Sequence, residues 1–374
     1  MTIRKTAIRK PPRSMLVITY GGHGDILLTT PLIASLKKAF PEATIDVYLQ
    51  NGRGGMLAGN PHVRAVFESV HRRGVTSYTE FFFRHTARYD LAVSTRMSDR
   101  QVVFCRAAGR RAVSLVPSRG HNQFWKEAIL DGWVRQDCQR HEVFEILRLA
   151  EVLGIEKILA CRPPSDPASE RRLDGLLPFD WRSAPYATMH LTPRNRYKAW
   201  TVHGWRAVAR HLRSQGLNVV LVGSPSEYEA PRYAANLVAD VSDGVVDLTG
   251  RITLADAAAL LGRCRAYVGP DTAVTHLAAV VEAPTVALYG WVNSRYMPYH
   301  EALSECPYRV VSPHRLSSGH VQVVIGECKC PPGESLCEHQ PREYSDCMRS
   351  IPLDLVTATL DAVLKTGYTA LKTG

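Results

Sequence analysis

The chain has 374 residues, 45% of them hydrophobic and 22% charged, which is enough for two soluble domains with cores of their own. It contains no run of about 18 apolar residues, which excludes a conventional membrane-spanning helix. Lys and Arg number 46 against 35 Asp and Glu, and the resulting net charge of +11 favours anionic partners, although it could also serve solubility alone.

The first 14 residues carry five basic side chains and no acidic one, and Pro11 and Pro12 block a long helix. The segment lacks the continuous apolar stretch of a secretory signal. We therefore predict a disordered basic arm over residues 1–14, either solvated or in contact with anionic lipid, on a cytoplasmic protein.

Strand-like runs then alternate with helical patterns, which indicates an α/β fold built on parallel sheets. In the first half, strands are expected at 15–20, 44–49 and 91–94, and helices at 31–40 and 142–153. Thr30 is the expected N-cap of the first helix, and Gly154 the expected stop of the second.

Breaker residues are frequent from 162 to 178, and we place an interdomain linker there. The predicted domains are therefore residues 15–165 and residues 180–350, followed by a C-terminal helix and tail at 351–374. The elements expected in the second half are strands at 186–191, 218–223, 266–269 and 285–289, and helices at 204–215, 253–263, 275–281 and 353–365.

Two loops resemble each other in design. Residues 21–25 read Gly-Gly-His-Gly-Asp, and residues 269–276 read Gly-Pro-Asp-Thr-Ala-Val-Thr-His; each follows a strand and precedes a helix. In open α/β sheets such loops offer backbone N–H groups to ligands. The first is not a dinucleotide-binding fingerprint, because Leu27 stands where the third glycine belongs. Gly22 and Gly24 would let the backbone approach a ligand, and Asp25 could either accept a proton or cap the helix.

These loops resemble those of the bacterial heptosyltransferases, glycosyltransferase family 9. The resemblance rests on residues 24–31 (Gly-Asp-Ile-Leu-Leu-Thr-Thr-Pro), on the stretch 141–154, and on 271–279 followed by 284–290. It implies a GT-B fold with two Rossmann-like domains facing a central cleft, in which residues 15–165 bind the acceptor and residues 180–350 bind the nucleotide-sugar donor. It also implies transfer of heptose from an ADP-heptose donor to a lipopolysaccharide inner-core acceptor.

The resemblance also implies roles for single residues. Asp25 matches the family's proposed general base, and Lys198 a lysine that binds the donor diphosphate. Further donor-binding residues implied in the same way are Thr192, Glu227, Asp271, Thr272 and His276. No Asp-x-Asp pair occurs in the chain, so we predict an inverting, metal-independent single displacement. Ala273 departs from the family's usual glycine, and would strain the loop if that position needs a positive φ.

Four cysteines cluster near the end of the second domain: Cys328, Cys330, Cys337 and Cys347. Four thiolates within some twenty residues could hold a structural zinc or iron ion, or could remain reduced. Some members of the resembled family hold iron with such cysteines, in enzymes that modify proteins. No cofactor is expected for catalysis.

Three function classes stay open at this point. The first is heptosyl transfer to lipopolysaccharide at the cytoplasmic face of the inner membrane, and a close variant uses a protein or another glycan as acceptor. The second is a non-catalytic nucleotide-sugar-binding protein of the same fold. The third, nucleic-acid binding, rests on charge alone and is not expected.

Overall fold

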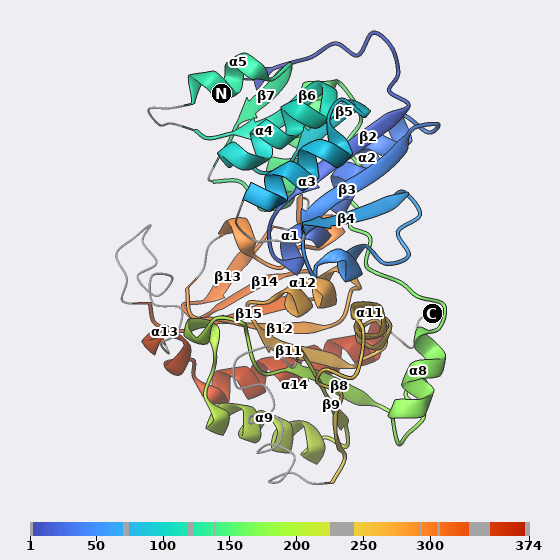
Figure 1. Cartoon of the computed structure of the whole chain (residues 1–374). Helices are drawn as coiled ribbons and strands as arrows, with labels where there is room; N and C mark the ends of the chain where they lie inside the picture. Colours follow the sequence, from blue (N-terminus) through green and yellow to red (C-terminus); the bar gives the residue numbers. More distant parts are fainter. Residues whose placement is uncertain are drawn as a thin grey trace. The chain divides into compact units, whose positions relative to one another are not determined.

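The computed structural model describes residues 3–69, 75–118, 123–137, 139–224, 243–291, 294–304, 307–328 and 345–370. The chain forms two compact units (Figure 1). Unit 1 comprises Met1–Pro164 together with Ser294–Tyr296, and unit 2 comprises Ser165–Asn293 together with Met297–Gly374. A three-residue segment from the second half of the sequence thus belongs to the first unit.

Unit 1 is built on a sheet with the strand order β1-β7-β6-β5-β2-β3-β4. Its pairs are parallel except for β1 with β7. The central strand β2 is apolar and buried on both faces, as expected for a parallel strand between helical layers. The strands are β1 (Ile3–Arg4), β2 (Ser14–Thr19), β3 (Thr44–Gln50), β4 (Ala65–Ser69), β5 (Tyr89–Ser94), β6 (Gly109–Val116) and β7 (Gly132–Arg135).

Helices cover this sheet in two groups. Helix α4 packs on β2, β5 and β6 with α3 beside it, whereas α7 packs on β6 and β7 and contacts α2. The helical segments of unit 1 are α1 (His23–Leu27), α2 (Thr30–Ala39), the 3-10 turn η1 (Gly54–Leu57), α3 (Val75–His85), α4 (Asp99–Ala108), α5 (Phe124–Ile129), α6 (Glu142–Ile146), α7 (Arg148–Leu153) and the 3-10 turn η3 (Ser294–Tyr296).

The prediction of a disordered arm is wrong for residues 3–14. Ile3 pairs with Val134 in the antiparallel β1–β7 ladder, and the Thr6 N–H donates to the Val152 carbonyl at 3.0 Å. An edge strand such as β7 offers unpaired backbone groups, and an extended basic segment can satisfy them without a hydrophobic run. The basic composition of this segment therefore did not indicate its structure correctly.

Unit 2 is built on a mixed sheet with the strand order β10-β9-β8-β11-β12-β15-β14-β13. In this order, the first six strands (β10, β9, β8, β11, β12 and β15) are parallel. Strands β14 and β13 add an antiparallel edge. The strands are β8 (Tyr186–His190), β9 (Asn218–Val222), β10 (Val245–Asp247), β11 (Ala266–Pro270), β12 (Thr285–Tyr289), β13 (Arg309–Ser312), β14 (Arg315–Ser318) and β15 (Val321–Ile325).

The C-terminal helix α14 (Leu353–Ala370) belongs to unit 2. Its Val356, Leu360 and Val363 are buried in one cluster with residues of α9, β9 and β11. The other helical segments described in unit 2 are α8 (Ser169–Leu176), η2 (Arg196–Lys198), α9 (Val202–Ser214), α11 (Leu254–Leu261), α12 (Ala273–Val280), η4 (Glu301–Ser304) and α13 (Asp346–Arg349). No helix in the described ranges has the length and apolar character needed to cross a bilayer.

The predicted linker contains a helix. Helix α8 lies inside the segment 162–178 and packs on α11, so the boundary between the units falls at Pro164 rather than across the whole segment. Arg172 fixes α8 by donating to both carboxylate oxygens of Asp256, at 2.6 and 3.1 Å. Asp256 also closes the capping box of α11 with Thr253.

We expect Asp256→Asn to lower the free energy of unfolding of unit 2 by about 1–2 kcal/mol at pH 7. Burial raises the pKa of Asp256, but hydrogen bonds from Arg172, Ser169 and Thr253 lower it by more. The net effect is a pKa lowered to about 2. A lowered folded-state pKa means that the stabilisation is complete above about pH 4 and is lost as pH falls toward 2. Chemical unfolding at several pH values should therefore show wild type and variant converging in acid. Asp166→Asn, which removes the more exposed partner of Arg172, is the control; equal stability gaps at pH 7 and pH 2.5 would contradict the prediction.

Candidate active site

Both sheets contain a point at which the chain reverses its direction of winding. In unit 1 the chain moves from β2 outward to β4 and then returns to β5 on the other side of β2. In unit 2 it moves from β8 to β10 and returns to β11 beside β8. Open α/β sheets bind ligands outside the carboxyl ends of the two strands at such switch points. Predicted site residues follow three of these four strands: Asp25 follows β2, Lys198 follows β8 and Asp271 follows β11.

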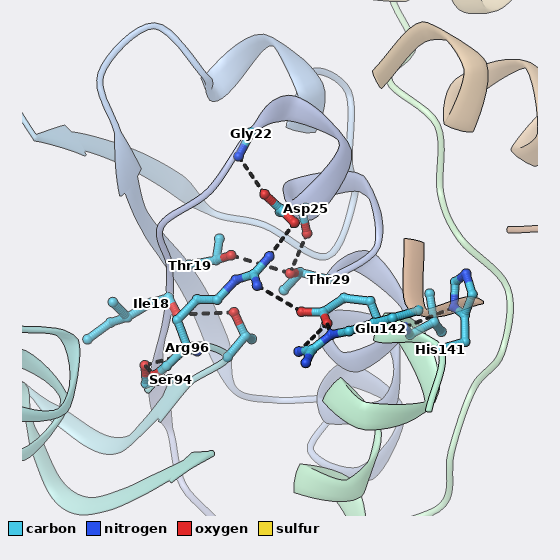
Figure 2. A network of polar contacts seen from close by, with 12 residues as sticks. Ile18, Thr19, Gly22, Asp25, Thr29, Ser94, Arg96, His141 and Glu142 are labelled. Atoms are coloured by element: carbon cyan, nitrogen blue, oxygen red, sulfur yellow. Dashed lines mark hydrogen bonds and ion pairs between the residues drawn. The ribbon is translucent and has the colours of Figure 1, made fainter. Parts of the chain in front are cut away.

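Asp25 lies on α1, just beyond the carboxyl end of β2 (Figure 2). One carboxylate oxygen accepts the Gly22 N–H at 2.6 Å, and the other is paired with the guanidinium of Arg96. About a quarter of the side chain (26%) remains exposed, so the carboxylate can still be reached from solvent. Asp25 therefore caps α1 and is held by a cation at the same time; the two readings of its role do not exclude each other.

Arg96 follows β5, the strand on the other side of the switch point, and it bridges two carboxylates (Figure 2). Its second terminal nitrogen lies 3.0 Å from Glu142, which is fully buried. Burial disfavours the charged guanidinium, but the charges of Asp25 and Glu142 outweigh it and raise the pKa of Arg96. The Arg96 cation is therefore a fixed part of the site.

The far oxygen of Glu142 is bound by Arg295, whose Nε and terminal nitrogen both lie at 2.6 Å. Arg295 is in the η3 segment of unit 1, far from Glu142 in sequence. The adjacent Tyr296 has a raised pKa because it is buried and near the Glu142 carboxylate. Four alternating charges, those of Asp25, Arg96, Glu142 and Arg295, thus form a continuous chain.

Sequence reasoning missed Arg96, Glu142 and Arg295. The predicted helix 142–153 is in fact two short helices, α6 and α7, which meet at Leu147. Gly154 ends α7 in the left-handed conformation, as predicted, with φ 67°. Glu142 and Glu145, one turn apart on α6, are both fully buried. Acidic residues at buried helical positions are rare without partners, and this was the available signal.

The glycines of the first loop have different tasks. Gly22 is the N-cap of α1 with an extended backbone, and Gly24 lies within α1. The critical position is Gly21, because a Cβ there would overlap the Asp25 carboxylate. Absence of a side chain at residue 21 therefore makes room for Asp25 in its observed orientation.

Lys198 and Asp271, both predicted to bind the donor, contact each other in unit 2. Lys198 ends η2 after β8, Asp271 follows β11, and the ammonium lies 2.5 Å from the carboxylate. Both side chains remain about a quarter exposed, at 28% and 23%. The switch point of unit 2 therefore carries an accessible lysine held by a carboxylate.

The neighbouring predicted residues lie on the same two strand ends. Thr192 follows β8 and is buried, and Thr272 is the N-cap of α12. The Thr272 hydroxyl makes no capping bond to α12 but lies 2.9 Å from Nδ1 of His190. His276 is buried on α12. The first N–H groups of α12 lack a side-chain cap, and a helix N-terminus of this kind suits an anion.

Ala273 does not strain the second loop. It is the first residue of α12 and has no positive φ, so a glycine is not required there. The concern raised from the sequence is thereby removed. Glu227, Cys330 and Cys337 lie outside the described residues. Of the remaining cysteines in the cluster, Cys328 is exposed and Cys347 is buried on α13. The proposed metal site stays a prediction.

Residues 154–312 match the model of glycosyltransferase family 9 (heptosyltransferase). The chain is 28% identical over 283 residues to lipopolysaccharide heptosyltransferase 3 of Escherichia coli, which covers 72% of this chain and 81% of the relative. The chain is a glycosyltransferase that is similar to family 9.

Solved structures agree with this assignment at the level of the fold. A family 9 glycosyl transferase from Veillonella parvula superposes with a TM-score of 0.73 at 16% identity, over 95% of this chain and 97% of that one. The E. coli ADP-heptose lps heptosyltransferase II superposes with a TM-score of 0.68 at 18% identity, over 94% and 99%. This glycosyltransferase therefore has the GT-B type of α/β fold.

Proposed function

We propose that this glycosyltransferase moves a heptose from ADP-heptose to the inner core of lipopolysaccharide, by an inverting single displacement that needs no metal. The substrates are those for which its relatives are named: lipopolysaccharide heptosyltransferase 3 and the ADP-heptose lps heptosyltransferase II of E. coli. A basic net charge of +11 suits both an anionic donor and a phosphorylated, membrane-borne acceptor. The cytoplasmic face of the inner membrane is the proposed location.

The observation that carries the proposal is the Lys198–Asp271 pair beside the N-terminus of α12. As the glycosidic bond to a nucleotide sugar breaks, the diphosphate gains negative charge. A positioned ammonium and uncapped backbone N–H groups stabilise that charge in the transition state. In this role Asp271 holds Lys198 in place before the donor arrives, and Thr192, Thr272 and His276 shape the surrounding wall. Glu227 is proposed to bind the donor ribose.

On the acceptor side, Asp25 is the proposed general base. Inversion requires the acceptor hydroxyl to attack the anomeric carbon as the diphosphate leaves, and to lose its proton in that step. The Asp25 carboxylate is exposed and is held by Gly22 and Arg96, and each of its oxygens keeps a further lone pair for the hydroxyl proton. Arg96 pairs with the carboxylate and fixes its orientation.

Calorimetric titration of the protein with ADP, UDP and GDP tests the donor. We expect ADP to bind at least about tenfold more tightly, which corresponds to about 1.4 kcal/mol. The protein should then release ADP from ADP-heptose only when heptose-deficient lipopolysaccharide is added. A preference for UDP or GDP would overturn the heptose donor, and ADP binding without transfer to any glycan or protein acceptor would indicate a nucleotide-sugar-binding protein.

A further inference from the structure

We infer that Glu142 and Arg295 are positioning residues for Asp25, acting through Arg96. The inference rests on the proposed function, in which Asp25 is the base. Neither residue contacts the Asp25 carboxylate directly. They determine where the Arg96 guanidinium lies, and Arg96 in turn determines the orientation of that carboxylate.

The first step concerns the geometry of Arg96. A guanidinium presents its N–H groups in a rigid planar fork, so fixing one arm fixes the other. One terminal nitrogen of Arg96 meets Asp25 and the other lies 3.0 Å from Glu142. Asp25 is partly exposed, whereas Glu142 is fully buried on α6. The buried partner is therefore the anchor, and the exposed partner is the group that it orients.

The second step concerns the charge on Glu142. A buried carboxylate is costly unless its lone pairs are satisfied and its charge is compensated. Arg96 forms an ion pair with one Glu142 oxygen only and would leave the other without a cationic partner. Arg295, itself only 8% exposed, supplies two contacts at 2.6 Å to that oxygen. Arg295 thereby supplies a second cationic contact to Glu142 in the interior, where Glu142 can hold Arg96.

The third step concerns the balance of charge. Asp25, Arg96, Glu142 and Arg295 alternate in sign and sum to zero, so removal of any inner member leaves the neighbouring charge uncompensated. Other titratable groups near Asp25 are Arg53, which approaches Gly22 and lies 3.4 Å from His23, and Tyr296 beside Glu142. None of these bonds to both carboxylates, as Arg96 does. Arg96 is the described residue through which Glu142 reaches Asp25.

The test compares Glu142→Gln with Glu145→Gln in transfer assays with ADP-heptose. The two glutamates make a matched pair: both are fully buried on α6, and Glu145 binds Arg148 at 2.9 Å instead of Arg96. We expect Glu142→Gln to lower kcat by about 10- to 100-fold, the usual size of an outer-shell effect, with little change in the KM for the donor. Glu145→Gln should lose stability but keep kcat within about twofold of wild type once folded protein is counted.

The pH profile supplies a readout that a structural role would not move. Glu142→Gln removes a negative charge from beside Arg96, and the acid limb of the kcat profile should therefore move to lower pH. Arg295→Met should move it to higher pH, because the negative charge of Glu142 is then less compensated. Arg295→Lys, which keeps the charge and loses the fork, should recover part of kcat and restore the wild-type limb.

The outcomes separate this inference from the function on which it rests. If wild-type protein transfers no heptose, the proposed function fails. If wild type is active and Glu142→Gln and Glu145→Gln have equal kcat values and unshifted profiles, the positioning role is wrong and the transfer reaction stands. If Glu142→Gln fails to fold, the kcat and pH profile of Arg295→Lys are compared with those of wild type instead. The thermal unfolding midpoint of each protein is measured alongside.

Discussion

Replacing Asp25 by Asn should lower kcat by about 10²- to 10⁴-fold, the usual contribution of a general base. The amide cannot accept the proton of the acceptor hydroxyl, and it also loses its charge pairing with Arg96. ADP affinity should be unchanged, because the predicted donor-binding residues lie in unit 2. Steady-state transfer assays combined with calorimetry of ADP binding measure both quantities on the same preparation.

Asp131→Asn is a matched control for this experiment. Like Asp25, Asp131 accepts one backbone N–H, from Ala112 at 2.8 Å, and pairs with an arginine, Arg106, also at 2.8 Å. It differs in lying away from the switch point of unit 1. We expect its kcat to stay near the wild-type value. Equal activity of the Asp25 variant and wild type would exclude Asp25 as the base.

Lys198→Met should lower kcat by about 10²- to 10³-fold and weaken ADP binding as well. Methionine keeps most of the apolar stem but cannot neutralise the diphosphate, and it leaves the Asp271 carboxylate unneutralised where the phosphates would bind. The effect on both binding and turnover distinguishes this variant from Asp25→Asn. The measurement is again transfer kinetics beside ADP calorimetry.

The control for Lys198 is Lys157→Met. Lys157 also forms an ion pair with a carboxylate, that of Glu151, but it lies in unit 1 and is exposed. Its loss should leave ADP binding and kcat unchanged. If Lys198→Met binds ADP as tightly as wild type, then this lysine does not hold the diphosphate, and the donor site must be sought elsewhere in unit 2.

Much of the fold could be predicted from the sequence. The parallel strands, such as β12 at 285–289, are short apolar runs between turn residues, and these patterns are local. The two loops could be placed because each follows such a strand. Strands β13 and β14 were not predicted, since their side chains are mostly not buried and their antiparallel pairing depends on tertiary contacts.

The site was predictable only where its residues share a motif. Asp25 and Lys198 stand in recognisable stretches, and the contact of Lys198 with Asp271 fits their common assignment to the donor. Arg96 follows an ordinary strand, and Arg295 lies 153 residues from its partner Glu142. Nothing in a single sequence links positions so far apart, because their pairing is created by the packing of α6 and η3 in unit 1.

The inclusion of Ser294–Tyr296 in unit 1 has a consequence for dissecting the protein. A fragment ending at Pro164 would include every strand of the first sheet yet lack Arg295, so Glu142 would be left buried with Arg96 as its one remaining cationic partner among those described. The first unit is discontinuous in the gene, and its chain of charges from Asp25 to Arg295 is completed only after most of the second unit has been translated. Truncation, domain exchange with relatives and ribosome-bound folding intermediates should all be designed and interpreted with that order of synthesis in mind.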